Sequence, residues 1–256
     1  LYRTELDWMR RMPQARGHKA RYREDAFYEL EKVAKQRFNT DNVKLEVKAL
    51  KTVKSSIQDI TEGEEDECEQ LMYALILSGL AMQMIGNSRP ASCAEHQVTH
   101  LWDMEVINGP LDALHGEKVS VAALLVLEEY KRIAAAITQG RCHAKPYENE
   151  DEELLKETFG KKGLLEEIRK ENEPELLETI SPQHLEKCLH GIEEIIDELP
   201  SEQTMFHLLE KAGCAKTVYD IGLDEAAVLP SLRLAPYTRR RLSLLRISKM
   251  LDIRGE

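Results

Sequence analysis

Three histidines in the middle of the chain are the residues best suited to chemistry. His96 and His100 are four positions apart, so on a helix they share a face and can address one metal ion or one substrate. His115 opens a strongly apolar segment, which predicts that its imidazole lies at a buried helix start. Two imidazoles fall short of a catalytic metal site, which usually has three protein ligands and an open position. On spacing alone, ordinary core or surface histidines that each make one hydrogen bond are the simpler interpretation.

A polar turn precedes these histidines. It consists of residues 86–92, Gly-Asn-Ser-Arg-Pro-Ala-Ser, and it separates two apolar segments. Cys93 and Glu95 follow closely enough in the sequence to be considered as a third metal ligand. Both are poor candidates, and Glu95 in particular is adjacent to His96, so the two side chains are expected to point in different directions from one helix.

Helices are the elements expected to position these residues. Charged residues make up 32% of the chain and aromatic residues only 5%, which favours helices with solvated faces over an aromatic-rich β-sandwich. After Ala49 the apolar residues fall at helical spacing, with no strand run between them. Ser181 and Ser201 are predicted helix starts, and Gly140 and Gly213 predicted stops. The predicted helices are Leu50–Ile60, Glu65–Ile85, Ala94–Ile107, Gly116–Thr138, Glu150–Phe159, Leu164–Glu171, Pro174–Thr179, Pro182–Leu199, Ser201–Ala212, Asp224–Ala235 and Thr238–Leu251.

Residues 1–49 differ in kind from the rest. They carry 12 Lys and Arg against 8 Asp and Glu, whereas residues 50–256 carry 23 against 38, which argues against a nucleic-acid surface in the larger part. Two helical segments, Tyr2–Met12 and Lys19–Arg37, predict a hairpin, and residues 43–48 alternate like one short strand. We therefore expect an all-α protein with a basic helical hairpin over 1–49 and a helical bundle domain over 50–256.

The cysteines indicate a reducing environment. Five cysteines are scattered along the chain, and no Cys-x-x-Cys pair is present. The longest mostly apolar stretch, Leu71–Ile85, is too short for a membrane span and is expected to be buried core. Since no signal segment is visible at the start, we expect a cytoplasmic protein with no membrane partner.

Two separated motifs resemble one family of oxidoreductases. Residues 78–92, followed by Ala94-Glu95-His96, closely resemble the signature of bacterial glycerol-1-phosphate dehydrogenases. The segment His115-Gly116-Glu117-Lys118-Val119 is similar to a second signature, shared with glycerol dehydrogenase, iron-containing alcohol dehydrogenases and dehydroquinate synthase. Residues 234–246 also look like the final helices of the family. The resemblance covers about residues 50–256, which would be the C-terminal helical domain.

The resemblance implies a role for each residue of interest. His96 and His115 would ligate a divalent metal, zinc or nickel, and His100 would be a neighbouring catalytic residue. Ser88 and Arg89 would bind the substrate phosphate, since a hydroxyl and a guanidinium suit a phosphate ester. In the intact family the metal polarises the substrate oxygen while NAD(H) or NADP(H) exchanges a hydride with dihydroxyacetone phosphate or glycerol 1-phosphate.

The chain departs from the family pattern in two places, just after the polar turn of residues 86–92 and over residues 1–49. Cys93 stands where the family usually has glycine, and Gln97 where many members have a further histidine. Residues 1–49 contain no Gly-rich strand-turn-helix, so they hold neither the dinucleotide-binding domain nor its aspartate ligand. We therefore expect the chain to be inactive alone and to need a cofactor-bearing domain or chain. The sequence leaves open whether it forms a homo-oligomer.

Residues 1–49 instead resemble the linker between the two nucleotide-binding domains of an ABC-F-type ATPase, notably over 2–11 and 15–21. In that family the linker faces the ribosome, and a basic excess suits RNA. No Walker motif is present, which excludes ATP hydrolysis for this piece. The alternative function is therefore a helical interaction module whose basic hairpin binds ribosomal RNA.

Overall fold

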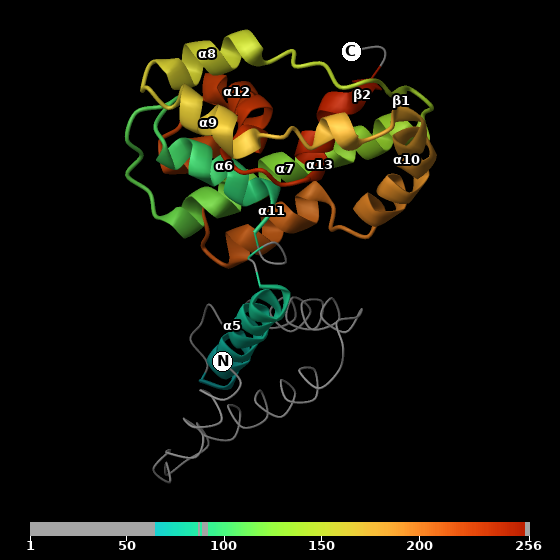
Figure 1. The fold of residues 1–256 in the computed structure, drawn as a ribbon. Helices are drawn as coiled ribbons and strands as arrows, with labels where there is room; N and C mark the ends of the chain where they lie inside the picture. The colour runs from blue at the N-terminus through green and yellow to red at the C-terminus, as the bar shows by residue number, and fades with distance from the viewer. Residues whose placement is uncertain (1–64, 87, 89–91, 254–256) are drawn as a thin grey trace. The chain divides into compact units, whose positions relative to one another are not determined.

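The computed structural model of the chain describes residues 65–86, 88 and 92–253 (Figure 1). The chain divides into two compact units, one ending at Ala91 and the other beginning at Ser92. The predicted ABC-F-like hairpin of residues 1–49, its short strand, the boundary near residue 50 and the helix Leu50–Ile60 all lie outside the described residues. They stay predictions.

The described part of the first unit is one helix and the turn after it. The helix α5 spans Glu65–Ile85, as predicted. Ala74 and Leu77 are buried and form a small apolar cluster with Tyr73 and Met84. Gly86 follows the helix with a φ of 73°, a conformation that glycine adopts without steric cost.

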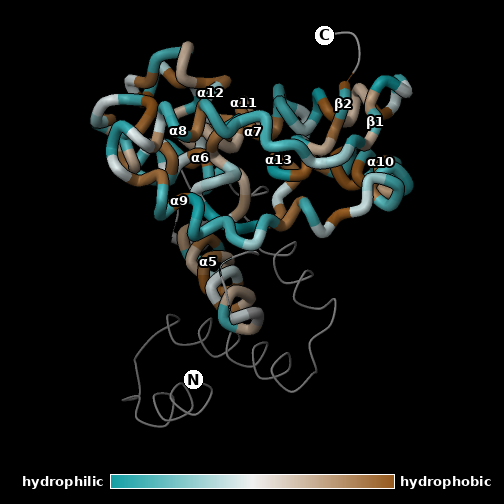
Figure 2. Tube along the Cα trace, turned by 45° about the horizontal axis from the view of Figure 1, so that its top comes forward, coloured by the Kyte–Doolittle hydropathy of each residue, from teal (hydrophilic) through white to brown (hydrophobic). Residues whose placement is uncertain are grey.

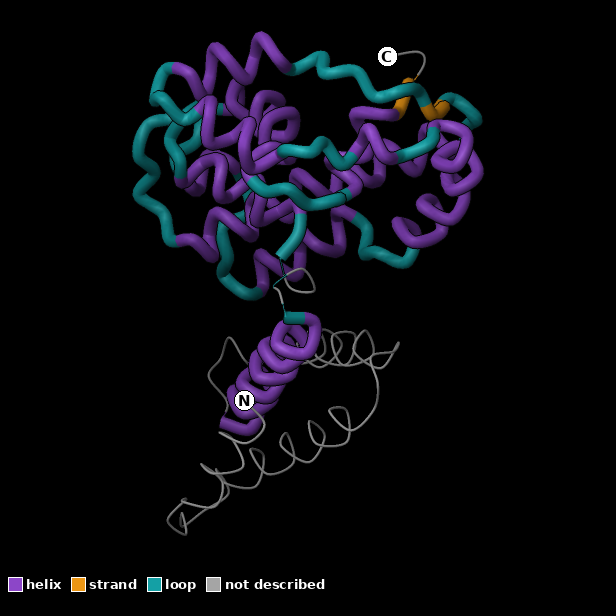
Figure 3. Tube along the Cα trace, viewed as in Figure 1, coloured by secondary structure: helices purple, strands orange, loops and turns teal. Residues whose placement is uncertain are grey.

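The second unit is a bundle of helices around α7, which spans His115–Thr138. Helix α7 packs against α6, α10 and α11, and helices make up most of this unit (Figure 3). The prediction of an all-α fold is confirmed for the described residues. The remaining helices are α6 Ala94–Asp103, α8 Glu152–Gly160, α9 Leu165–Asn172, α10 Pro182–Asp197, α11 Glu202–Lys211, α12 Val228–Leu234 and α13 Leu244–Ile247, with short 3-10 turns at Leu177–Thr179, Val218–Ile221, Glu225–Ala227, Ala235–Thr238 and Ser248–Met250.

Helix α7 contributes to two apolar clusters along its length. Its first half, with Val121 and Ala122, joins the larger cluster around Trp102. Its second half, with Ile133 and Ala136, joins a smaller cluster with residues of α10. Brown and teal alternate along helices such as α10, as expected where one face of a helix is buried and the other solvated (Figure 2). The central helix thereby connects the two clusters.

The helix caps follow the sequence signals. The Ser181 and Ser201 hydroxyls accept hydrogen bonds from backbone N–H groups three residues later, at 3.4 and 3.1 Å. Gly140 and Gly213, with φ of 64° and 65°, follow the ends of α7 and α11. In the described part of the chain, no helix combines the length and the hydropathy that a bilayer crossing requires.

A small β-sheet corrects the expectation that no strand interrupts the helices after Ala49. Strand β1, Cys142–Ala144, pairs antiparallel with β2, Leu251–Ile253, so that Cys142 lies opposite Ile253 (Figure 3). Three residues are too few to show an alternating pattern, and the partner strand is far away in the sequence. Neither strand could therefore be recognised locally.

The predicted helix Thr238–Leu251 is wrong over its first part. The chain turns at Arg239 and Arg240 and is non-helical to Ser243, the residue that caps α13. The reason is tertiary: Thr238 and Ser243 use their hydroxyls to bond Gln97 of α6. Such long-range bonds override a helical spacing of apolar residues.

Arg246 ties the C-terminal segment to the rest of the bundle. Its side chain is only 1% exposed, and it lies on α13. Its guanidinium donates to Asn172 Oδ1 at 2.7 Å, to the Pro236 carbonyl at 3.0 Å and to Glu175 Oε2 at 2.7 Å. Three segments are therefore held by one buried cation.

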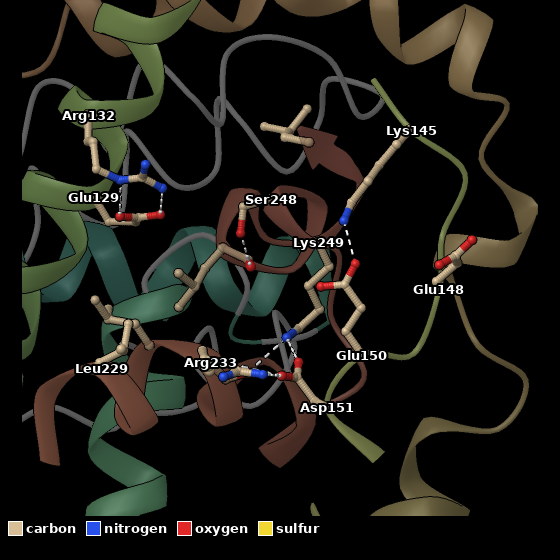
Figure 4. Close-up of a pocket in the computed structure, with 13 residues that line it drawn as sticks. Glu129, Arg132, Lys145, Glu148, Glu150, Asp151, Leu229, Arg233, Ser248 and Lys249 are labelled. Atoms are coloured by element: carbon tan, nitrogen blue, oxygen red, sulfur yellow. Dashed lines mark hydrogen bonds and ion pairs between the residues drawn. The ribbon is translucent and has the colours of Figure 1, made fainter. Parts of the chain in front are cut away.

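A second buried charge, Asp151, lies beside a cavity of about 610 Å³ (Figure 4). Arg233 Nη2 donates to its carboxylate at 2.6 Å, and Lys249 forms an ion pair with it. Burial alone would raise the pKa of Asp151, but the charges and hydrogen bonds of Lys249 and Arg233 lower it below its ordinary value.

Asp151 is accordingly expected to make the fold sensitive to acid. Because the folded-state pKa lies below the unfolded one, its stabilisation is present above about pH 4 and is lost as the pH falls through the folded value. Each unit of pKa difference is worth about 1.4 kcal/mol. Urea unfolding of Asp151→Asn should therefore show a weaker loss of stability between about pH 5 and pH 2 than the unchanged chain. An identical pH dependence in the two proteins would contradict this role.

Candidate metal and substrate site

Helices α6 and α7 bring the three predicted histidines together. Helix α6 buries Ala94, Val98 and Leu101 on one side. His96 and His100 are only partly buried. His115 is the first residue of α7, which packs against α6. The ring centroid of His115 lies 5.7 Å from that of His96 and 5.7 Å from that of His100, and the latter two are 6.5 Å apart.

These separations approach those of a metal ligand set. Two imidazoles bound tetrahedrally to one zinc at about 2.0–2.1 Å have ring centroids roughly 5 Å apart. The observed triangle is wider by up to about 1.5 Å. As they stand, no three or more His, Cys, Asp or Glu side chains among the described residues are close enough to hold a metal. The donors therefore suit a divalent metal in chemical type, but their present spacing is too wide for three of them to hold one ion.

Two of the three imidazoles have a carboxylate partner. Glu95 Oε1 lies 2.8 Å from His96 Nδ1, and Asp103 Oδ2 lies 3.1 Å from His115 Nδ1. In a neutral imidazole, a carboxylate at Nδ1 favours the proton on that nitrogen and leaves a lone pair on Nε2. Metal-ligating histidines commonly have such a partner.

The contact between Glu95 and His96 corrects the expectation that their side chains diverge. Glu95 lies in the first turn of α6, where unpaired backbone N–H groups attract a carboxylate. Its Oε1 also accepts a hydrogen bond from the Cys93 N–H at 2.8 Å. The carboxylate thus turns back toward the helix start, where it reaches the neighbouring ring.

The expectation of a buried helix start at His115 is also wrong. The His115 side chain is 49% exposed, because burial along α7 begins only at Val121. Asp103 lies between two partners, with one carboxylate oxygen facing His115 Nδ1 and the other bonded to Lys118 Nζ. The end of α6 at Asp103, instead of the predicted Ile107, places this carboxylate beside the first turn of α7.

His100 differs from the other two histidines because no carboxylate hydrogen-bonds to its ring among the described residues. Burial lowers its pKa, and the positive charges of Arg239, His115 and His96 lower it further, against the opposing effect of Asp103. These effects favour the neutral form of the imidazole, in which one ring nitrogen carries a lone pair.

Gln97 lies on the buried side of α6 and does not face the imidazole cluster. It is 1% exposed, and its amide donates to the Arg239 carbonyl at 3.1 Å and more weakly to the Pro236 carbonyl at 3.4 Å. Its Oε1 accepts a hydrogen bond from Ser243 Oγ at 2.9 Å. Gln97 therefore anchors the C-terminal segment on the helix that carries His96 and His100. Sequence reasoning missed that Arg239 lies near enough to His100 for its charge to act on that imidazole. The run of three arginines at 239–241 was the signal available for it.

The structure does not test the predicted phosphate ligands. Ser88 belongs to the first unit, in the turn after α5, and is partly buried. Arg89 lies outside the described residues. The assignment of both to the substrate phosphate stays a prediction.

Comparison with known proteins identifies one group of relatives. The chain is 30% identical over 186 residues to the glycerol-1-phosphate dehydrogenase of Geobacillus stearothermophilus, which covers 72% of this chain and 39% of the relative. It is 32% identical over 190 residues to that of Halalkalibacterium halodurans, covering 73% and 39%. The enzyme of Geobacillus thermodenitrificans is 28% identical over 190 residues, covering 74% and 40%. All three carry NAD(P)+ in their names.

The chain spans about two fifths of the length of these relatives. No protein-family model matches it. No solved structure matches it either. Over nearly three quarters of its length, the chain is similar to glycerol-1-phosphate dehydrogenases, and it resembles the C-terminal region of that family.

Proposed function

We propose that residues 50–256 form the metal- and substrate-binding part of an NAD(P)-dependent glycerol-1-phosphate dehydrogenase-like oxidoreductase. The observation that carries this proposal is the convergence of three imidazoles from α6 and α7, at centroid separations of 5.7–6.5 Å. The similarity to dehydrogenases of that name supports the same class of reaction.

His96 and His115 are the proposed ligands of a divalent zinc or nickel ion. They are favoured over His100 because each has a carboxylate at Nδ1, which orients the ring and raises its basicity. When bound, the metal supplies a Lewis acid for the substrate oxygen. The dinucleotide-binding domain and its aspartate ligand would come from another domain or chain, since residues 1–49 contain no Gly-rich strand-turn-helix.

His100 is the proposed catalytic residue. Its ring lies within 6.5 Å of both proposed ligands by centroid distance, so it lies beside the substrate oxygen in this proposal. In oxidation of glycerol 1-phosphate, a ring nitrogen of His100 would accept the hydroxyl proton, and a bound NAD(P)+ would supply the hydride acceptor. In the reverse direction His100 returns the proton to the carbonyl oxygen of dihydroxyacetone phosphate. Ser88 and Arg89 would bind the phosphate.

The isolated chain is expected to show no dehydrogenase activity, because residues 1–49 lack a dinucleotide-binding motif. The assay is reduction of dihydroxyacetone phosphate with NADH or NADPH in the presence of zinc or nickel. Turnover above the level of a His100→Ala control would contradict this expectation.

Glu95→Gln is expected to weaken zinc binding by about 10- to 100-fold. The amide keeps the shape of the side chain but removes the charge that accepts the His96 Nδ1 proton. Competition against a chromophoric chelator measures the affinity. Glu198→Gln, an exposed change on the C-terminal side of α10, is the matched control. Equal zinc affinities for the Glu95 variant and this control would contradict the role of Glu95 in orienting His96 for metal binding.

A further inference from the structure

A cavity of about 610 Å³ lies in the second unit beside Asp151 (Figure 4). Small-molecule sites in proteins have volumes of about 300–1,000 Å³ and combine apolar walls with a few well-placed polar groups. The lining of this cavity comes from α7, the segment after β1, α12 and the residues from α13 to β2. It includes no residue of the imidazole cluster. The cavity is therefore separate from the proposed dehydrogenase site.

Leucines supply the apolar part of the wall. Leu245 and Leu251 are buried, Leu232 is partly buried and Leu229 is exposed. The exposed Leu229 marks where the wall reaches solvent, and it is seen on the opposite side of Arg233 from the other charged residues of the wall in Figure 4. An apolar wall that continues from the surface to the interior suits a ligand with an apolar portion.

Two ion pairs in the wall each join one cation to one carboxylate. Arg132 Nε lies 2.8 Å from Glu129 Oε2, and Lys145 Nζ lies 2.6 Å from Glu150 Oε1. The remaining carboxylate, that of Glu148, is exposed, so solvent and salt screen its charge. These residues therefore leave little net charge that acts on the buried part of the cavity.

The charges around Asp151 are not balanced. Arg233 and Lys249 both form ion pairs with this one carboxylate, so the three side chains carry a net charge of +1. The additional partner of Asp151, Tyr237, contributes a neutral hydroxyl. Asp151 and Lys249 are largely buried, where water screens charge poorly. A surplus positive charge beside a cavity attracts an anion.

The two cations keep donors for such an anion. Arg233 uses Nε and Nη2 for Asp151 Oδ1, at 3.0 and 2.6 Å, and its Nη1 makes no hydrogen bond within residues 92–253. Lys249 Nζ donates to Asp151 and to the Arg233 carbonyl, and an ammonium has three N–H groups. The Arg233 side chain is also exposed, so a ligand can reach it from solvent.

We infer that this cavity binds a small carboxylate with a short apolar chain, whose anionic group contacts Arg233 and Lys249 and whose chain packs on the leucines. A carboxylate brings one negative charge, which matches the surplus of one positive charge. A phosphate ester brings nearly two charges at pH 7 and exceeds it. The inference does not rest on the proposed function.

The test is isothermal titration calorimetry of the metal-free full chain with acetate, butyrate and hexanoate at pH 7. Each added methylene is expected to tighten binding by about two- to fourfold, because it buries apolar area. Hexylamine has a chain of similar length and the opposite charge, and it should bind at least about tenfold more weakly than hexanoate. No measurable binding of hexanoate, equal affinities for acetate and hexanoate, or equal affinities for hexanoate and hexylamine would each overturn the inference.

Arg233→Gln is expected to weaken hexanoate binding by about tenfold or more, since hydrogen bonds to charged groups are among the strong ones. Arg169→Gln is the matched control, because it removes the same charge from an exposed arginine outside the lining. An equal loss in the two variants would overturn the role of Arg233.

Leu229→Ser tests the apolar wall without removing a charge. It is expected to weaken hexanoate by about threefold and to leave acetate unchanged, because only the longer chain reaches this leucine. Leu242→Ser, an exposed leucine outside the lining, is its control. Equal affinities of the two leucine variants for hexanoate would contradict the placement of the chain.

The metal site gives the last distinction. His96→Ala should leave hexanoate affinity within about twofold of the unchanged chain, because the two sites share no residue. Loss of hexanoate binding in that variant would place the carboxylate at the imidazole cluster and overturn the inference. A chain that binds hexanoate but not zinc would contradict the proposed function and leave this site standing.

Discussion

Replacing His96 with alanine is expected to weaken zinc binding by more than about 100-fold, beyond the loss caused by removing an outer carboxylate. The substitution removes one of the two imidazoles with a carboxylate partner from a cluster whose rings lie 5.7–6.5 Å apart. His115→Ala should have an effect of the same size, because the two rings are proposed to address the same ion from different helices. Zinc affinity is measured by competition against a chromophoric chelator, and cobalt substitution gives an independent optical signal.

The matched control for this experiment is His207→Ala. His207 lies on α11, its side chain is 63% exposed, and its ring pairs with Glu210 on the same helix. Its loss should leave zinc affinity unchanged. A His96 variant that binds zinc as tightly as the His207 variant would contradict the proposal that His96 is a metal ligand. A loss in the His96 variant alone, with His115→Ala unaffected, would show that the ion does not lie between α6 and α7.

Arg246→Ala is expected to destabilise the second unit by about 3–5 kcal/mol. The variant removes a guanidinium that is 1% exposed and leaves Glu175, only 15% exposed, without its cation. It also leaves Asn172 Oδ1 without this donor, and it leaves the Pro236 carbonyl with only the weaker bond from Gln97 at 3.4 Å. Such a loss is a large fraction of the stability of a typical domain. Urea unfolding followed by circular dichroism at pH 7 measures it.

The control for Arg246→Ala is the same substitution at an exposed arginine. Arg169 lies on α9 and pairs with Glu152 and Glu166 at the surface. Its replacement by alanine should lower the stability far less than Arg246→Ala does, because solvent screens a surface ion pair. A similar midpoint for the Arg246 and Arg169 variants would mean that the buried network contributes no more than a surface ion pair.

Much of the helical framework could be predicted from local signals. The bounds of α5 agree with its apolar spacing, and Ser181 and Ser201 cap the helices that they were predicted to start. These features depend on residues a few positions apart, where propensity and capping chemistry decide. The spacing of His96 and His100 likewise placed both rings on one face of α6.

Other features depend on contacts that no local pattern contains. The pairing of β1 with β2 joins distant segments that are each three residues long. The non-helical course of residues 239–243 follows from bonds to Gln97, a residue whose buried role its polar type did not suggest. The carboxylates at His96 and His115 depend on where side chains turn, as the unexpected contact of Glu95 with His96 shows.

The central claim is that His96 and His115 bind one divalent metal ion between α6 and α7. X-ray absorption at the zinc edge of the loaded chain tests it most directly, because the spectrum reports the atoms around the ion and their distances. At least two imidazole nitrogens at about 2.0–2.1 Å are expected, falling by one in His96→Ala and in His115→Ala. A shell of oxygen atoms alone, or of sulfur at about 2.3 Å from the scattered cysteines, would contradict the claim.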